Sequence, residues 1–160
     1  MIYRGGREIY TRNELTIRAP LETIFALAAD VTRWPLILPH YRYVRVLRGG
    51  ETQLLEMGAS RSGIPVRWTS TQMCDVQTHH IRYEHVHGVT RGMVVQWTFA
   101  ESRGGCRVSI EHWLVPSRIW LKIRASQIIV GRLFVMHIAD KTLHGLAHQA
   151  ESLPDHGTLR

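Results

Sequence analysis

Residues 93–143, MVVQWTFAESRGGCRVSIEHWLVPSRIWLKIRASQIIVGRLFVMHIADKTL, contain the change of pattern that decides the fold. Apolar residues alternate over 93–101 and again over 106–116, and Gly104-Gly105 stands between the two runs, which predicts a β-hairpin. From 118 to 152 apolar residues recur every three or four positions, as in a helix of about nine turns. Pro116 separates the patterns. The sequence therefore predicts antiparallel strands followed by one long C-terminal helix.

The strand pattern also runs upstream of this hairpin. Gly49-Gly50 separates two further alternating runs and indicates another hairpin turn. A Pro at position 20 suits the first turn of an amphipathic helix. The complete set of expected elements is a strand over 7–18, a helix over 21–29, a helical turn over 33–38, strands over 41–47, 52–58, 64–75, 80–87, 93–101 and 106–116, and the helix over 118–152.

These elements predict an α+β helix-grip fold, in which a curved antiparallel β-sheet of six or seven strands wraps around the long C-terminal α-helix. We expect one domain over residues 1–160, with its core at 8–152. The last helix is the only element long enough to cover the sheet, and a cavity between the two is expected. The alternative is that side chains fill this space completely.

Composition narrows the function further. The net charge of +7 comes from 20 Lys and Arg residues that are scattered singly. Solvated strand faces account for such a distribution, so we expect no nucleic-acid partner. The N-terminus has no apolar run typical of a signal peptide, and charged residues interrupt the longest apolar segment. The predicted compartment is the cytoplasm.

No cofactor or metal site is expected from the sequence. Cys74 and Cys106 are too few for a disulfide scaffold and do not form a zinc pair. Among the ten histidines, the pairs 79–80, 85–87 and 144–148 match no metal-binding spacing.

Strand alternation predicts which side chains face the helix. On 64–75 the more apolar set is Ile64, Val66, Trp68, Ser70, Gln72 and Cys74. The same rule groups Ile81, Tyr83, His85 and His87; Met93, Val95, Trp97 and Phe99; and Cys106, Val108, Ile110, His112 and Leu114. The inner face is then apolar with a few polar groups, which suits a flat, oxygenated, hydrophobic ligand.

Several short motifs along the chain together resemble those of a known family. The motif is Ala19-Pro20, Ile24-Phe25, Asp30-Val31, Trp34-Pro35 and Leu38-Pro39-His40-Tyr41, joined by VRWTS (66–70), VQWTF (95–99) and IADKTL (138–143). It is similar to the START-like (SRPBCC) superfamily, within it the polyketide cyclase/dehydrase and lipid-transport group. The resemblance covers about residues 8–152 and implies the helix-grip fold and a deep cavity, but this scaffold hosts carriers, receptors and enzymes.

The bacterial aromatase/cyclases are the similar enzymes in that group. The resemblance implies that Trp34 and Tyr41 match their cavity-mouth Trp and catalytic Tyr, and that Trp68, Ser70 and Trp97 face the cavity. His85 and His112 match an Arg and a Gln there. The chain departs from the pattern at Gln72, where those enzymes have a proton-donating arginine, because glutamine cannot titrate.

The leading hypothesis is a binding or carrier domain for a hydrophobic small molecule, such as a polyketide, quinone or lipid. The expected ligand contacts are Trp34, Leu38, Trp68, Ser70, Gln72, Tyr83, His85, Trp97 and Phe134. The alternative is a polyketide cyclase/aromatase-dehydratase acting on a poly-β-ketone, with Tyr41 and His112 as the catalytic candidates. A third hypothesis is an accessory subunit with a filled core. Ser70 lacks the surroundings of a nucleophile.

Residues 117–137 combine a large apolar side with four Arg and Lys residues. Such a helix can contact a membrane transiently, with Ile119, Trp120 and Ile123 as an apolar lip, or simply cover the sheet. The sequence does not decide between a monomer and a homodimer.

Overall fold

We describe a computed structural model of the chain, in which residues 9–61, 63–88, 90–114 and 125–153 are placed. The chain runs through β1 (Ile9–Ile17), α1 (Leu21–Ala29), a 3-10 turn η1 (Val31–Arg33) and α2 (Trp34–Ile37) before the strands follow without interruption. The remaining elements are β2 (Tyr41–Arg48), β3 (Thr52–Arg61), β4 (Ile64–Asp75), β5 (His80–Gly88), β6 (Met93–Ser102), β7 (Gly105–Leu114) and α3 (Ala125–Ser152).

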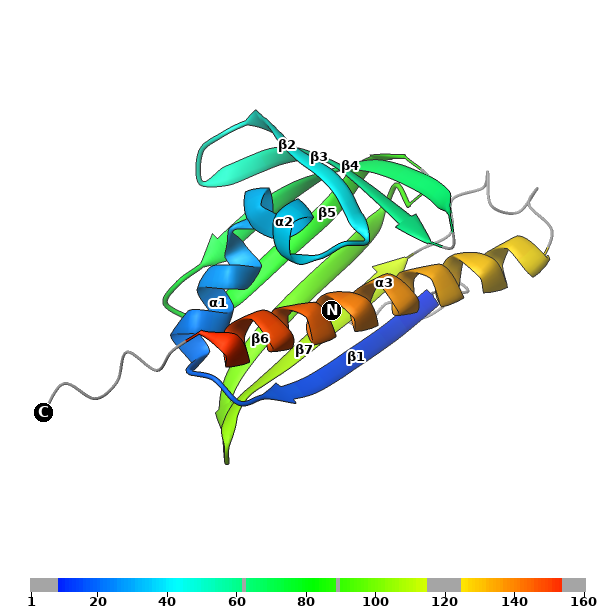
Figure 1. The fold of residues 1–160 in the computed structure, drawn as a ribbon. Helices are drawn as coiled ribbons and strands as arrows, with labels where there is room; N and C mark the ends of the chain where they lie inside the picture. The colour runs from blue at the N-terminus through cyan, green and yellow to red at the C-terminus, as the bar shows by residue number, and fades with distance from the viewer. Residues whose placement is uncertain (1–8, 62, 89, 115–124, 154–160) are drawn as a thin grey trace, which may run out of the picture.

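One antiparallel sheet contains all seven strands, in the order β1-β7-β6-β5-β4-β3-β2. Strands β2 to β7 form a meander, and β1 pairs with β7 from Ile9 opposite Leu114 to Ile17 opposite Cys106. Helix α3 lies across one face of the sheet, beside β1, and α1 and α2 cover the other end of that face (Figure 1). The predicted helix-grip fold is confirmed, with seven strands.

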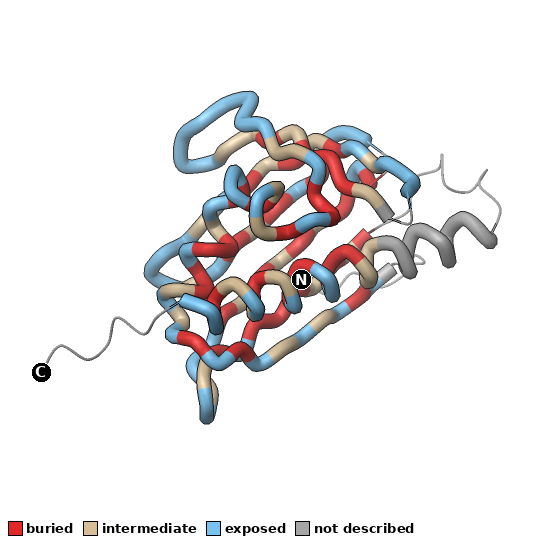
Figure 2. Tube along the Cα trace, in the orientation of Figure 1, coloured by how far each residue is buried: buried red, intermediate tan, exposed pale blue. Residues whose placement is uncertain are grey.

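The core lies between the sheet and the helices, where buried positions follow the strands behind α3 (Figure 2). Alternation holds along β6 and β7, where the inward residues Trp97 and Ile110 are 4% and 1% exposed. The predicted amphipathic helix is α1, and its buried side includes Ile24, Leu27 and Ala28. Period-two patterning therefore placed the inner face correctly over most of the sheet.

Two predicted inward residues face solvent instead. His87 is exposed because β5 contains a bulge: Thr69 pairs with His87 but Ser70 pairs with His85, so the register shifts by one residue. One extra residue reverses the side on which every later side chain lies. Ile64 is 66% exposed, at the start of β4 beside the β3–β4 turn.

Glycine at position 145 has a packing reason within α3. A Cβ atom there would lie 2.4 Å from Leu38 Cδ2, so the helix and the segment after α2 approach closely. This contact offsets the low helix propensity of glycine. Residues 118–124 of the predicted helix, and the apolar lip at Ile119, Trp120 and Ile123, lie outside the described residues.

Candidate ligand-binding site

A cavity of about 70 Å³ lies between the inner face of the sheet and α3. Most of its lining is apolar, and its polar groups come from separate elements. The lining residues are Trp34, Tyr41, Met57, Val66, Trp68, Tyr83, His85, Thr90, Met93, Val95, Trp97, Ile110, His112, Val135, Ile138, Ala139 and Thr142. The space between sheet and helix is therefore not completely filled.

Four aromatic side chains form one wall of this cavity. The ring centroids of Trp34 and Tyr41 lie 4.9 Å apart, those of Trp34 and Trp97 5.8 Å apart, and those of Tyr41 and Trp68 6.2 Å apart. Trp34 Nε1 donates to the carbonyl of Leu27 at 3.1 Å, which fixes the indole in place. These packed rings present flat apolar surface to the cavity, which suits a flat ligand.

Directly opposite residues on neighbouring strands form a row across the sheet, and several of them have polar side chains. Gln72 on β4 lies opposite Tyr83, Tyr83 opposite Val95, Val95 opposite His112, and His112 opposite Thr11 on β1. Directly opposite residues share one face of a sheet, so all five point inward. Gln72 Nε2 donates to the Tyr83 hydroxyl at 3.0 Å. The row brings together a phenol and an imidazole that are far apart in sequence.

Each histidine of the cavity wall is held through one ring nitrogen by a threonine. His85 Nδ1 lies 2.6 Å from Thr90 Oγ1, and His112 Nδ1 lies 3.2 Å from Thr11 Oγ1. Among the described residues, neither histidine has a hydrogen-bond partner at Nε2. A threonine hydroxyl can donate or accept, so each Nε2 can serve as an acceptor or as a donor. His85 also stacks on Trp68, with 5.7 Å between ring centroids.

Burial keeps these imidazoles neutral. It lowers the pKa of His85 to about 3, with a further lowering from nearby His112, and it lowers the pKa of His112 to about 4. Removing a charged imidazolium from water is costly, and no described carboxylate forms an ion pair with either residue. At neutral pH both side chains are uncharged hydrogen-bonding groups in an apolar wall.

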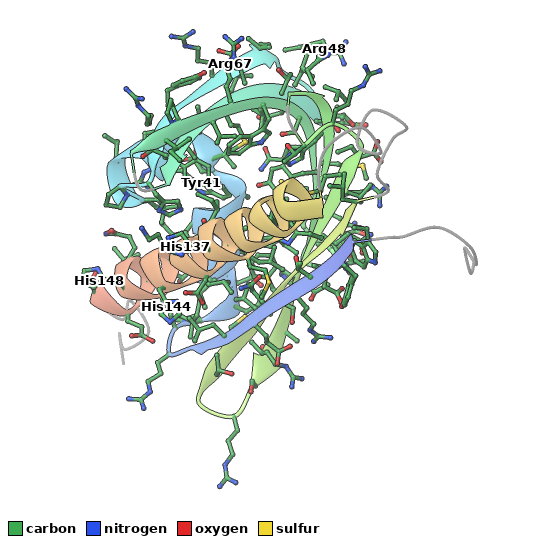
Figure 3. The ribbon with its side chains drawn as sticks, turned by 90° about the vertical axis from the view of Figure 1, so that its right-hand side faces the viewer. Tyr41, Arg48, Arg67, His137, His144 and His148 are labelled. Atoms are coloured by element: carbon green, nitrogen blue, oxygen red, sulfur yellow. The ribbon has the colours of Figure 1, made fainter. Side chains whose placement is uncertain are left out.

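Tyr41 belongs to a second polar group, on the side of the cavity formed by α3. The Thr142 hydroxyl donates to the Ile138 carbonyl at 2.7 Å and lies 2.9 Å from His40 Nε2, which must therefore be the donor. The rings of His40 and Tyr41 lie 4.8 Å apart between centroids, and burial raises the pKa of Tyr41. Tyr41 lies beside α3, as Figure 3 shows. This cluster joins the start of β2 to the helix.

The structure brings seven of the predicted site residues to the cavity: Trp34, Tyr41, Trp68, Tyr83, His85, Trp97 and His112. Leu38 packs against Gly145 of α3, and Ser70 contacts Met57 Sδ at 3.8 Å. Gln72 lines a different groove, of about 510 Å³, between the end of α1 and the β2–β3 hairpin. The side chain of Phe134 lies outside the described residues.

Sequence reasoning missed the threonines of the site. Thr142 follows Ile138 by four positions on one side of α3, so helical spacing could have revealed it. Thr90 follows β5 in the β5–β6 connection, where no periodic pattern operates, and Thr11 is recognisable only once β1 is paired with β7. No group of three or more His, Cys, Asp or Glu residues within the described ranges could hold a metal ion. In the same ranges no helix is both long and apolar enough to cross a bilayer.

A seven-stranded sheet gripping a helix, with an apolar cavity between them, defines the START-like class of ligand-binding folds. The family model for polyketide cyclase/dehydrase and lipid transport matches residues 17–133, more than half of the chain. The chain therefore belongs to this family.

Individual relatives agree with this assignment. The granaticin polyketide synthase bifunctional cyclase/dehydratase of Streptomyces violaceoruber is 34% identical over 92 residues, which cover 56% of this chain and 28% of that protein. The matched region thus spans little more than a quarter of that relative.

Solved structures share the fold. The Zhui aromatase/cyclase from Streptomyces sp. R1128 superposes with a TM-score of 0.77 at 19% identity and covers 91% of this chain and 94% of that one. The major latex-like protein 151 of Panax ginseng gives a TM-score of 0.75 at 10% identity, over 91% of this chain and 99% of that one. At these identities the similarity concerns the fold.

Proposed function

We propose that this chain binds a hydrophobic, oxygen-bearing small molecule, such as a polyketide, quinone or lipid, in the cavity between the sheet and α3. The observation that carries the proposal is the pairing of aromatic walls with neutral histidines whose Nε2 atoms have no partner among the described residues. Apolar walls supply affinity, and a few convergent polar groups supply orientation.

The size of the cavity defines what fits without rearrangement. At about 70 Å³ it has room for about five water molecules, or for a single ring. A multi-ring ligand requires the walls to move apart. The small side chain of Ala139 on α3 leaves space on the helix side of the cavity, which a larger residue there would fill.

A second candidate function is polyketide cyclisation and dehydration. Tyr41, His85 and His112 reach one cavity from three strands, and a poly-β-ketone folded there would be held for intramolecular aldol closure. The granaticin relative is named as a cyclase/dehydratase, which supports this alternative. Gln72 cannot titrate, so His112 or Tyr41 would have to move the proton.

Ligand binding is tested by native mass spectrometry of protein from its own host, with extraction of bound molecules, and by titration with an apolar fluorescent probe. Ala139→Leu adds three carbons inside the cavity and should abolish probe binding. Ala147→Leu adds the same carbons on the same helix, at a partly buried position outside the cavity lining, and should retain it. An empty protein that also fails to bind the probe would mean that the cavity is not a ligand site.

The variants Tyr41→Phe and His112→Gln distinguish the two candidate functions. A cyclase should lose turnover of a poly-β-ketone while its affinity for the product changes little. A carrier should show changes in affinity alone, with no chemical conversion in the wild type.

The remaining proposals concern the surroundings of the protein. We propose a cytoplasmic location, and transient membrane contact through residues 117–137 stays a prediction of the sequence. Co-sedimentation with anionic vesicles tests the contact, and light scattering coupled to size exclusion distinguishes a monomer from a homodimer.

A further inference from the structure

The orientation of the Gln72 side chain follows from its partners. Gln72 is 2% exposed, and its Nε2 atom lies 3.0 Å from the Ala29 carbonyl and 3.0 Å from the Tyr83 hydroxyl. A backbone carbonyl can only accept, so the amide nitrogen, and not the amide oxygen, must face Ala29. Both N–H groups of Gln72 are then used, and the second one donates to the Tyr83 oxygen.

This arrangement leaves the proton of Tyr83 without a partner. The phenol oxygen accepts from Gln72, while its own O–H group meets no acceptor among the described residues. Tyr83 is 4% exposed and lines the cavity, and its neighbour in the row across the sheet is the apolar Val95. A buried donor without an acceptor is unfavourable, so a cavity occupant that offers an oxygen would be favoured there.

We propose that Tyr83 donates a hydrogen bond to a carbonyl oxygen of the bound ligand, and that Gln72 is the positioning residue that fixes its phenol. The inference rests on the proposed binding function and assigns a ligand class, a ketone or quinone. Donation from Gln72 into the phenol oxygen polarises the O–H bond and makes Tyr83 a stronger donor. Burial raises the pKa of Tyr83, so the phenol keeps its proton at neutral pH.

The test uses acetophenone, a single-ring ketone, and its hydrocarbon isostere α-methylstyrene, in which a CH₂ group replaces the oxygen. The infrared carbonyl stretch of ¹³C-labelled acetophenone reports hydrogen-bond donation directly. In the wild-type protein we expect a frequency below that in hexane and close to that in an alcohol. A bound ketone with a hexane-like frequency would overturn the inference without any variant.

Tyr83→Phe should return the carbonyl stretch to the hexane value and weaken acetophenone binding by about 5- to 10-fold, because one hydrogen bond is lost. Binding of α-methylstyrene should change less than about twofold. Gln72→Met should keep a shifted carbonyl band but broaden it, since the phenol is no longer held. Tyr10→Phe makes the same change outside the cavity and should leave the band as in the wild type.

The outcomes distinguish the two proposals. If neither compound binds the wild type, the binding function and the inference fall together. If both compounds bind but Tyr83→Phe keeps the shifted band, or Tyr41→Phe removes it instead, the binding function stands and the role of Tyr83 is overturned.

Discussion

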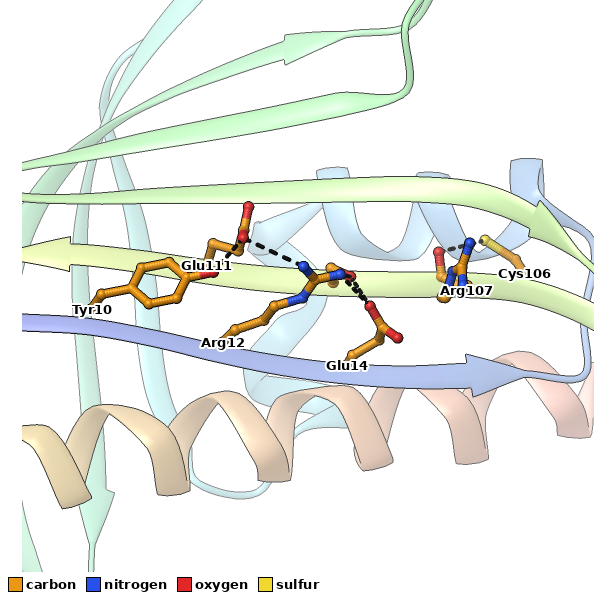
Figure 4. A network of polar contacts seen from close by, with 7 residues as sticks. Tyr10, Arg12, Glu14, Cys106, Arg107 and Glu111 are labelled. Atoms are coloured by element: carbon orange, nitrogen blue, oxygen red, sulfur yellow. Dashed lines mark hydrogen bonds and ion pairs between the residues drawn. The ribbon is translucent and has the colours of Figure 1, made fainter. Parts of the chain in front are cut away.

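Polar side chains on the two faces of β7 differ in how completely they are paired. On the outer face, Glu111 accepts from the Tyr10 hydroxyl at 2.5 Å, and Arg12 bonds Glu14, which also accepts from Ser109 at 2.6 Å (Figure 4). On the inner face, His112 has one partner, Thr11, and directs the rest of its ring to the cavity wall.

The outer network pairs charges that water also solvates, whereas the inner groups are neutral and only partly paired. An exposed ion pair contributes little free energy, because solvent screens it and long side chains lose freedom. A buried polar group without its full set of partners is costly unless a ligand or water completes it. The neutral, partly paired groups of the inner face therefore suit ligand binding, whereas the paired charges of the outer face suit contact with water.

The largest difference in stability is expected between substitutions at two adjoining residues of β7, Ile110 and Glu111. Ile110→Ala, at a position that is 1% exposed, should lower the free energy of unfolding by about 3 kcal/mol through lost packing. Glu111→Ala should cost less than about 1 kcal/mol. Urea denaturation of both variants measures the difference, and equal losses would remove the distinction between the faces.

Lowering the pH should destabilise the fold through the buried histidine His85 on the inner face of the sheet. The pKa of His85 is lowered to about 3 by burial and by His112, well below the ordinary 6.5. Between these values the unfolded chain binds the extra proton, so stability is complete above about pH 6.5 and falls as the pH decreases. His85→Gln should reduce the slope of stability against pH by up to about 1.4 kcal/mol per pH unit. Denaturation at several pH values checks this, and an unchanged slope would contradict it.

Substitution of Thr90, the threonine that hydrogen-bonds with His85, should have a smaller effect on stability. Thr90→Val preserves the shape but leaves Nδ1 without its partner at 2.6 Å, which should cost about 1–2 kcal/mol. Thr16→Val, at an exposed position of β1, is the matched control and should be nearly neutral. Thermal unfolding compares the two, and indistinguishable midpoints would argue against the contact.

The smallest effect is expected on the outer face. Tyr10→Phe removes the hydrogen bond to Glu111 on a surface open to water and should change stability by about 0.5 kcal/mol or less. A loss comparable to that of Thr90→Val would mean that the outer network stabilises the fold as strongly as the inner contacts do.

Much of the site could be predicted, because strand periodicity assigns faces reliably where the register is regular. The inward positions of Trp68, Tyr83 and His112 follow from alternation alone. His87 could not be placed in this way, since a bulge in β5 shifts the register by one residue and leaves no mark in the local sequence. Leu38 was expected at the ligand, and the close approach to Gly145 directs it to the helix instead.

The sequence by itself determined the order of elements, a curved sheet of six or seven strands with its covering helix, and the apolar character of the inner face. These features depend on local periodicity and turn residues, which act over a few positions. Only the tertiary structure decided that Thr11, Thr90 and Thr142 hydrogen-bond with His112, His85 and His40, and that Gln72 leaves the Tyr83 proton free. The reason is physical: a hydrogen bond between residues up to 102 positions apart depends on strand pairing and helix placement, which no local pattern encodes.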